Sequence, residues 1–301
     1  MHSLLKTPLE SALSSPLAAA VCRRRLKGKR LILSYHGILP AGAAPAGERT
    51  LFVTQREFGR QLDYLARTVD VVPLANIDEA GQGRPRVAIT FDDAYRGALQ
   101  EGVRELAARH LPATFFVAPA RLGGHTFWWD ALAPADGALD EGVREHALQS
   151  LGGADEKVRA WALDAKLHVS NLIPGYAQSG TLAQLRKAVE VPGITVGSHS
   201  WSHANLASLG REDLVAELER SRDWLRAEFG DKFVEWVAYP YGLDSEETRR
   251  AAADASYVGG LRIGGSWHRP DPEVSFKRPR LSVSGNLSLA GFRARVVGAL
   301  E

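Results

Sequence analysis

Short apolar runs alternate with helix-like segments along most of this chain, and this alternation limits the fold more than any other feature. The apolar runs occupy residues 31–35, 69–74, 87–91, 114–117, 195–197 and 234–238. The segments between them repeat apolar residues at helical spacing, as Leu214, Leu218 and Leu225 do. Strands that alternate with helices are typical of βαβ units, so we expect an α/β fold with a mainly parallel sheet.

Two regions depart from this alternation. Residues 1–30 form an N-terminal lead-in that ends in the basic run 23–30, and we interpret this run as a solvated approach to the first strand. The alternative is a basic patch for a membrane surface or an anionic glycan. Residues 130–176 are rich in alanine, have a helical pattern and lack strand signals, which indicates an inserted helical subdomain or lid.

Charge and composition exclude several classes of protein. The 37 basic and 35 acidic residues give a net charge of +2, so no nucleic-acid partner is indicated. The single cysteine, Cys22, excludes an intramolecular disulfide. No window approaches the ~20 apolar residues of a membrane-spanning helix, and Lys6 and Pro8 interrupt the segment where a signal peptide would lie. We expect a cytoplasmic location, with peripheral contact at the membrane face left open. Nothing in the sequence indicates an oligomeric state.

Polar residues with catalytic chemistry follow the predicted strands. His36 follows the first run, Asp92 and Asp93 follow the run 87–91, and His199 and His203 follow the run 195–197. The carboxyl ends of parallel strands carry the functional site in α/β folds, so these side chains are expected to meet.

The spacing of the two histidines indicates a metal site. On a helical turn, side chains four residues apart lie about 5–6 Å from each other at Cβ, and both rings then reach one ion. One carboxylate of the Asp92–Asp93 pair would complete a three-ligand set, and the other would act as a base. The alternative for the acidic pair is a helix N-cap. A metal held by two imidazoles and one carboxylate polarises a carbonyl and lowers the pKa of bound water, which suits hydrolysis of an amide or ester.

The complete set of motifs resembles the NodB-homology polysaccharide deacetylases, carbohydrate esterase family 4. The motifs are TFDD at 90–93, HSWSH at 199–203 and YPYG at 239–242, supported by SYHG at 34–37, PATFFV at 112–117 and RPRLSV at 278–283. This resemblance covers about residues 31–285. It implies a distorted (β/α) barrel of about seven parallel strands over 31–285 that includes the helical insertion at 130–176. We expect a C-terminal helix in the remaining residues, 286–301.

The resemblance also implies a site. Asp93, His199 and His203 would bind a divalent metal, most often zinc. Asp92 would be the general base, and the backbone N–H of Tyr241 would stabilise the oxyanion. The acetyl group of an N-acetylated sugar in a glycan or glycoconjugate would then be hydrolysed, which leaves an amine.

The chain departs from the family pattern at two places. The third motif commonly begins with an arginine that braces the base, but Ala238 stands here, and Arg280 could supply the guanidinium instead. The motif with the family's acid histidine is not recognisable, so His36 is the candidate for the acid or for a substrate contact. The residues expected at the carbohydrate are Trp128, Trp129, Tyr239 and Arg280.

These departures leave two alternatives open. The first is an O-deacetylase, whose ester substrate needs less help in protonating its leaving group, or a hydrolase of another non-peptide amide. A catalytically impaired carbohydrate-binding protein of the same fold would keep the metal but lack turnover.

Overall fold

The computed structural model describes residues 26–79, 83–134 and 137–300. Most of the expected N-terminal lead-in, including Cys22, therefore lies outside the described residues. None of the described helices is long and apolar enough to cross a membrane.

Seven parallel strands close into a barrel, which confirms the expected fold. They follow the order β1-β10-β9-β8-β7-β6-β5 around the barrel, and β1 pairs with β5 to complete the ring. The register shifts between β7 and β8, so the barrel is distorted. The strands are β1 (Arg30–Tyr35), β5 (Arg86–Phe91), β6 (Ala113–Val117), β7 (Ile194–Ser198), β8 (Phe233–Ala238), β9 (Gly259–Ile263) and β10 (Arg278–Ser282). Three shorter strands are β2 (Gly37–Leu39), β3 (Phe52–Thr54) and β4 (Asp70–Val71).

Alternate strand residues build two separate apolar cores. Strand side chains alternate between the two faces of a sheet, so one set fills the barrel and the other meets the helices. Leu31 and Leu33 of β1 belong to the outer core, whereas Ile32 between them belongs to the inner one. The inner core also contains Leu74, Ile77, Ala88, Phe116, Trp236, Ala238 and Leu261.

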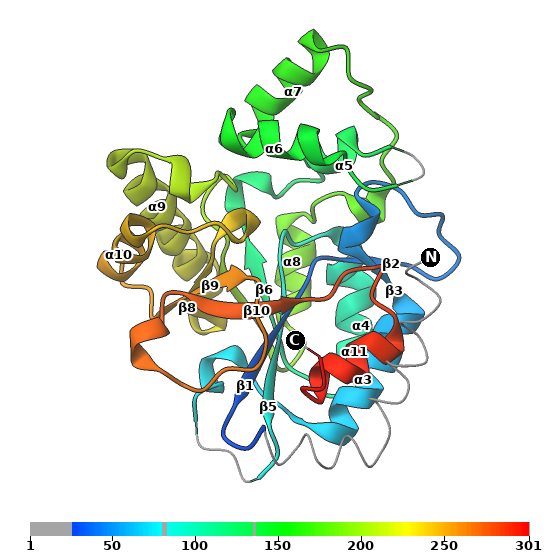
Figure 1. Cartoon of the computed structure of the whole chain (residues 1–301), viewed down its shortest axis with the longest axis vertical. Coiled ribbons are helices and arrows are strands. Elements are labelled where there is room, and N and C mark those ends of the chain that lie inside the picture. Colours follow the sequence, from blue (N-terminus) through cyan, green and yellow to red (C-terminus); the bar gives the residue numbers. More distant parts are fainter. Residues whose placement is uncertain (1–25, 80–82, 135–136, 301) are drawn as a thin grey trace.

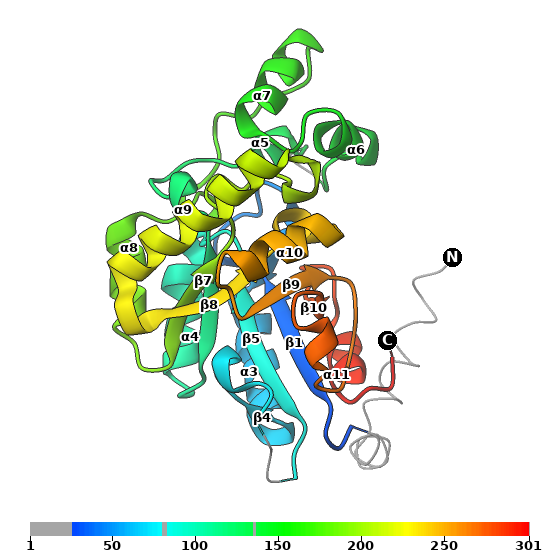
Figure 2. The same ribbon diagram turned by 90° about the vertical axis from the view of Figure 1, so that its left-hand side faces the viewer.

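Six helices surround the barrel in Figures 1 and 2: α3 (Gln55–Thr68), α4 (Val103–Ala107), α8 (Leu182–Val189), α9 (Arg211–Phe229), α10 (Glu246–Asp254) and α11 (Leu289–Val296). Thr54 caps α3, because its Oγ1 accepts the N–H of Glu57 at 3.2 Å. The helical segment between β5 and β6 begins as a π-helical turn, Ala98–Gly102, and continues as α4.

The remaining helices lie beyond the carboxyl ends of the strands, at the top of Figure 1. They are α5 (Trp128–Leu132), α6 (Glu141–Gln149) and α7 (Asp155–Asp164), and they occupy the region expected as a helical insertion. No strand occurs among the described residues of 130–176. The division of the chain into barrel, insertion and C-terminal helix stays a prediction.

Two strand expectations need correction. The run 69–74 forms only the two residues of β4, because Pro73 lacks the N–H that a longer ladder would use. Strand β9 was not expected from the apolar pattern because it begins with Gly259 and Gly260. A Cβ at Gly259 would lie 2.5 Å from the Trp236 ring, so packing inside the barrel requires glycine at that position.

Candidate active site

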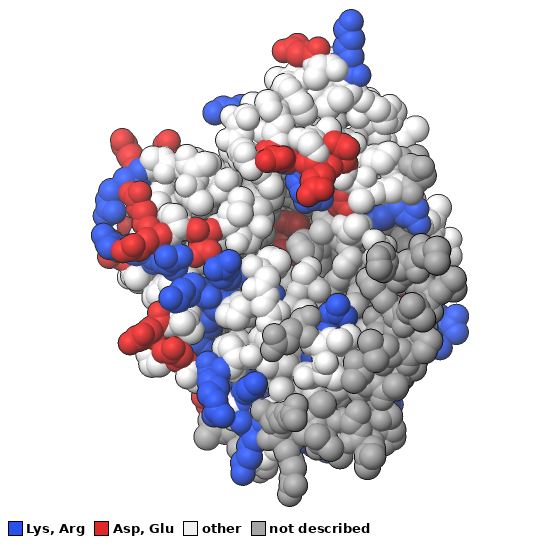
Figure 3. Space-filling model, viewed as in Figure 1, with Lys and Arg blue, Asp and Glu red and all other residues white. Residues whose placement is uncertain are grey.

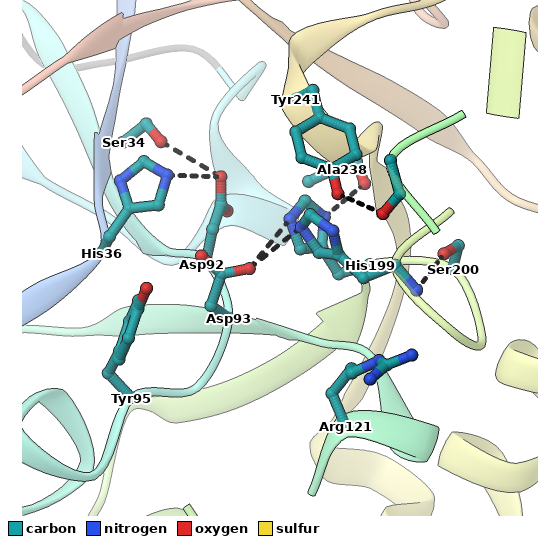
Figure 4. A network of polar contacts seen from close by, with 12 residues as sticks. Ser34, His36, Asp92, Asp93, Tyr95, Arg121, His199, Ser200, Ala238 and Tyr241 are labelled. Atoms are coloured by element: carbon teal, nitrogen blue, oxygen red, sulfur yellow. Dashed lines mark hydrogen bonds and ion pairs between the residues drawn. The ribbon is translucent and has the colours of Figure 1, made fainter. Parts of the chain in front are cut away.

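Three potential metal ligands converge at the carboxyl end of the barrel. Asp93 follows β5, His199 and His203 follow β7, and all three are buried. Asp93 Oδ1 lies 3.1 Å from His203 Nε2 and 3.6 Å from His199 Nε2. One ligand atom of each residue lies within 4.8 Å of the other two. Figure 4 shows the Asp93 carboxylate pointing toward His199, and the three residues together could hold one ion.

The donor atoms of this triad fit a divalent metal. Asp93 Oδ1 is buried and accepts no hydrogen bond from the described residues. His199 Nδ1 lies 2.7 Å from the Ala238 carbonyl, and donation there leaves the Nε2 lone pair facing Asp93. Burial lowers the pKa of His199, and it lowers the pKa of His203 to about 4. Both rings therefore favour the neutral form, which binds metals such as zinc.

The two histidines do not lie on a helical turn, which corrects the expectation from their spacing. Residues 199–203 form a loop in which Ser200 and His203 have φ angles of 61° and 64°. Ser200 Oγ accepts the His203 N–H at 3.1 Å. Glu217 of α9 accepts the N–H groups of Trp201 and Ser202 at 3.0 and 2.9 Å. Side chains thus replace helical hydrogen bonds in this loop, and the two imidazole centroids still lie 4.7 Å apart.

Asp92 lies beside the triad and is held by an arginine. Arg280 donates from Nη1 and Nη2 to the two carboxylate oxygens of Asp92, each at 2.7 Å. Ser34 Oγ donates to Asp92 Oδ2 at 3.3 Å. Burial alone would raise the pKa of Asp92, but the charge and the hydrogen bonds of Arg280 outweigh it and hold the pKa well below its usual range. Asp92 is therefore ionised at neutral pH and can accept a proton. Arg280 on β10 therefore supplies the guanidinium that the expected motif would have at the position of Ala238.

His36 lies on the opposite side of Asp92 from His199 (Figure 4). Its Nε2 is 3.9 Å from Asp92 Oδ2, and 18% of its side chain is exposed. Burial lowers the pKa of His36 and favours its neutral form. The ring can therefore contact a substrate that approaches Asp92.

Tyr241 connects the loop after β8 to the helical insertion. Its φ of 61° lies in the left-handed region, which is strained for a tyrosine. The phenol donates to the Gly153 carbonyl at 2.9 Å and accepts the Trp128 Nε1–H at 3.1 Å. The Tyr241 ring centroid also lies 4.7 Å from that of His203. The insertion therefore fixes the loop that carries the expected oxyanion donor.

These groups surround one cavity of about 180 Å³. Figure 3 shows a hollow below the insertion with acidic side chains at its floor. The predicted site residues that line the cavity are His36, Asp92, Asp93, Trp129, His199, His203 and Tyr241. Its other lining residues are Leu51, Arg144, Gly242, Ile263 and Ser282.

Three residues expected at the substrate lie behind the cavity wall. Trp128 is buried against Tyr241, and Arg280 is fully buried against Asp92. Tyr239 is also buried, and its hydroxyl donates to the Phe276 carbonyl at 2.8 Å. Each supports a neighbouring group instead of reaching the cavity surface.

Sequence reasoning did not identify several site residues. Ser34 and Ser282 lie near the ends of β1 and β10, so the strand-end rule could have found them. Ile263 ends β9, a strand that the apolar pattern did not predict. Arg144 stands on α6, in a region without strand signals, and no local pattern marks it.

The sequence matches the family model described as polysaccharide deacetylase over residues 79–260. This chain belongs to the polysaccharide deacetylase family. No curated protein sequence gave a match.

Solved structures agree on the fold. The Streptococcus pyogenes deacetylase PplD, in complex with acetate, superposes with a TM-score of 0.61 at 19% identity and covers 89% of this chain and 97% of its own. IcaB from Ammonifex degensii gives 0.62 at 19% identity, covering 90% and 97%. A polysaccharide deacetylase from Bacillus cereus gives 0.61 at 16% identity, covering 89% and 69%. At such identities these likenesses establish the barrel alone.

Proposed function

We propose that this protein is a metal-dependent N-deacetylase that hydrolyses the acetamido group of an amino-sugar glycan or glycoconjugate. One observation carries the proposal: an ionised carboxylate held by an arginine, Asp92, shares a cavity with the Asp93, His199 and His203 ligand set. Family membership supports deacetylation as the class of reaction.

Each group at the cavity has a defined role in this proposal. Asp93, His199 and His203 hold the ion, for which zinc suits two imidazoles and a carboxylate. When bound, the ion supplies Lewis acidity toward the acyl oxygen and the attacking water. Asp92 accepts the proton of that water, and the Tyr241 backbone N–H donates to the developing oxyanion.

His36 is proposed to pass to the leaving amine the proton that Asp92 takes from the attacking water, because the ring itself starts in the neutral form. It lies beside Asp92 at the cavity surface, and no second histidine outside the ligand set lines the described cavity. An amine must be protonated to leave, whereas an alkoxide from an ester needs less help. We therefore expect His36→Gln to lower acetate release from both kinds of sugar. The loss on N-acetylated sugars should exceed the loss on O-acetylated sugars by a factor of about ten or more. Equal losses on both substrates would assign His36 to binding.

Acetate release from an N-acetylated chitooligosaccharide, with detection of the new amine, tests the function. Asp92→Asn should retain the metal and lose turnover by roughly 100-fold or more, because only the base is removed. His199→Ala should lose the metal as well. Metal loss in the Asp92 variant would mean that the two aspartates have exchanged roles.

The same assay separates the alternatives. Release from O-acetylated sugars alone would establish an O-deacetylase. Glycan binding without release from either substrate would establish an impaired binding protein and overturn the proposal.

A further inference from the structure

Arg144 is the only lysine or arginine among the described residues that line the cavity. It stands on α6 of the helical insertion, and 39% of its side chain is exposed. Neither the metal set nor the proposed proton transfers use it. Its position places a permanent positive charge at the wall of a cavity that binds the substrate.

A buried carboxylate fixes the position of Arg144. Glu48 is fully buried, and its Oε2 lies 3.2 Å from Arg144 Nη2. The same carboxylate accepts the N–H of Leu139 at 2.5 Å and both the N–H and the hydroxyl of Thr50, at 3.2 and 2.5 Å. Because Glu48 is held by four hydrogen bonds, it is a rigid support for the guanidinium.

Arg144 retains unused hydrogen-bond donors. A guanidinium has five N–H groups in a planar fork, and Glu48 engages Nη2 alone among the contacts of the described residues. The remaining donors are available to a ligand in the cavity. This planar arrangement matches a carboxylate or a phosphate better than it matches a neutral hydroxyl.

The surroundings of Arg144 limit the size of the anion. Glu141 and Glu145 are exposed on the same helix, and acidic and basic side chains occur together on the insertion above the hollow in Figure 3. These acidic groups disfavour a long polyanion along this helix. The cavity volume of about 180 Å³ is below the range of roughly 300–1,000 Å³ typical of drug-sized ligands. A single anionic group on the sugar, or on its immediate neighbour, fits both conditions.

We infer that Arg144 determines specificity by binding one anionic substituent, a carboxylate or a phosphate, close to the acetamido group that is hydrolysed. This inference rests on the proposed deacetylase function. Arg144 does not take part in bond breaking, and Glu48 acts as its positioning residue.

Three probes of the full-length, metal-loaded protein test this inference. They are a neutral N-acetylated chitotetraose, a glycan of equal length with lactyl carboxylates on alternate sugars, and N-acetylglucosamine 1-phosphate. We expect a higher kcat/KM on at least one anionic probe than on the neutral one. Arg144→Gln should lower that value by roughly 10- to 100-fold, as expected for lost charge-assisted hydrogen bonds, and should change turnover of the neutral probe less than about twofold. The anionic probe with the higher kcat/KM shows whether Arg144 binds a carboxylate or a phosphate.

Two further variants keep the test decisive. Arg250→Gln removes an exposed arginine on α10 that pairs with Glu246, and should change no probe. Arg144→Lys keeps a positive partner for Glu48 if the glutamine variant does not fold, and should lose most of the anion preference. Equal losses on all three probes, or no anion preference in the parent protein, would overturn the inference. Failure of the parent protein to release acetate from any of the three probes would instead overturn the deacetylase function.

Discussion

At the scale of single residues, Asp92 depends on Arg280 for both its orientation and its charge. The two parallel hydrogen bonds fix the carboxylate plane, and the guanidinium keeps the buried group ionised. Sequence spacing could not reveal this contact, because 188 positions separate the two residues.

Loss of Arg280 should alter the pH dependence of the reaction. The arginine holds the pKa of Asp92 below its usual range, so Arg280→Met should raise that pKa. Because the base must be ionised, the acidic limb of the pH profile of kcat/KM should move to higher pH. We also expect a loss of roughly 100-fold at neutral pH. Arg280→Lys should restore part of the activity, and an unshifted acidic limb in the methionine variant would contradict the role of Arg280.

The buried carboxyl group of Asp130 should make the free energy of unfolding depend on pH, which gives a second test at the residue scale. Burial raises its pKa to about 8 from the ordinary 3.8, and its oxygens accept hydrogen bonds from Tyr95 and from the Glu48 N–H. Between these two values the folded protein keeps the proton and the unfolded chain loses it. The free energy of unfolding should therefore decrease as pH rises through this window, by roughly 1.4 kcal/mol per pH unit.

Denaturant unfolding of Asp130→Asn over this pH range checks the effect. The variant cannot ionise, so its stability should decrease less with pH than that of the parent protein. Asp231→Asn, at an exposed position, serves as the control and should follow the parent. Identical slopes for the parent and Asp130→Asn would contradict the prediction.

At the scale of elements, the helical insertion supports the site through one short α-helix. Trp128 and Trp129 of α5 are buried: the first donates to the Tyr241 hydroxyl, and the ring of the second lies 5.0 Å from His203. The expectation that both tryptophans contact carbohydrate stays a prediction, and of the two, Trp129 is the one that lines the cavity.

We expect Trp128→Phe to lower kcat by about fivefold while KM changes little. The substitution keeps the aromatic ring but removes the N–H that holds Tyr241, and a hydrogen bond of this kind contributes about 1 kcal/mol. Steady-state kinetics on an N-acetylated oligosaccharide would measure the change. Trp161→Phe on α7, remote from the cavity lining, is the matched control. A pure increase in KM would instead place Trp128 at the substrate.

The sequence predicts most elements but not their fine geometry. Apolar runs located β1, β5, β6, β7 and β8 because most residues of each are buried on both faces of the strand. Strand β9 lacks an apolar run at its start because the Trp236 ring occupies the space that a side chain at Gly259 would need. The histidine spacing correctly indicated proximity but wrongly indicated a helical turn, since the hydrogen bonds that shape the loop come from Ser200 and from Glu217, which is distant in sequence.

At the scale of the whole molecule, the barrel brings six strand ends and the insertion to one cavity. The strand-end residues were predictable because parallel strands place their carboxyl ends at one edge. The contribution of Leu51 and Arg144 to the cavity was not predictable, because it depends on how a loop and the insertion pack over the barrel. The expected cytoplasmic location and zinc identity stay predictions.

Metal binding should also stabilise the whole fold. An ion that binds the folded protein and not the unfolded chain raises the free energy of unfolding, by about 2.7 kcal/mol at a free concentration 100 times Kd. The Tm of the chelated protein should therefore rise when zinc is added. The Tm of Asp93→Ala should not respond, and an equal rise in that variant would place the ion elsewhere.

The central claim is that the Asp93, His199 and His203 set supports metal-dependent N-deacetylation. Acetate release from an N-acetylated oligosaccharide, measured before chelation, after chelation and after stoichiometric zinc addition, tests it most directly. We predict that chelation abolishes release and that about one zinc per chain restores it, while His203→Ala stays inactive at the same zinc level. Undiminished acetate release from protein shown to be free of metal would contradict the claim.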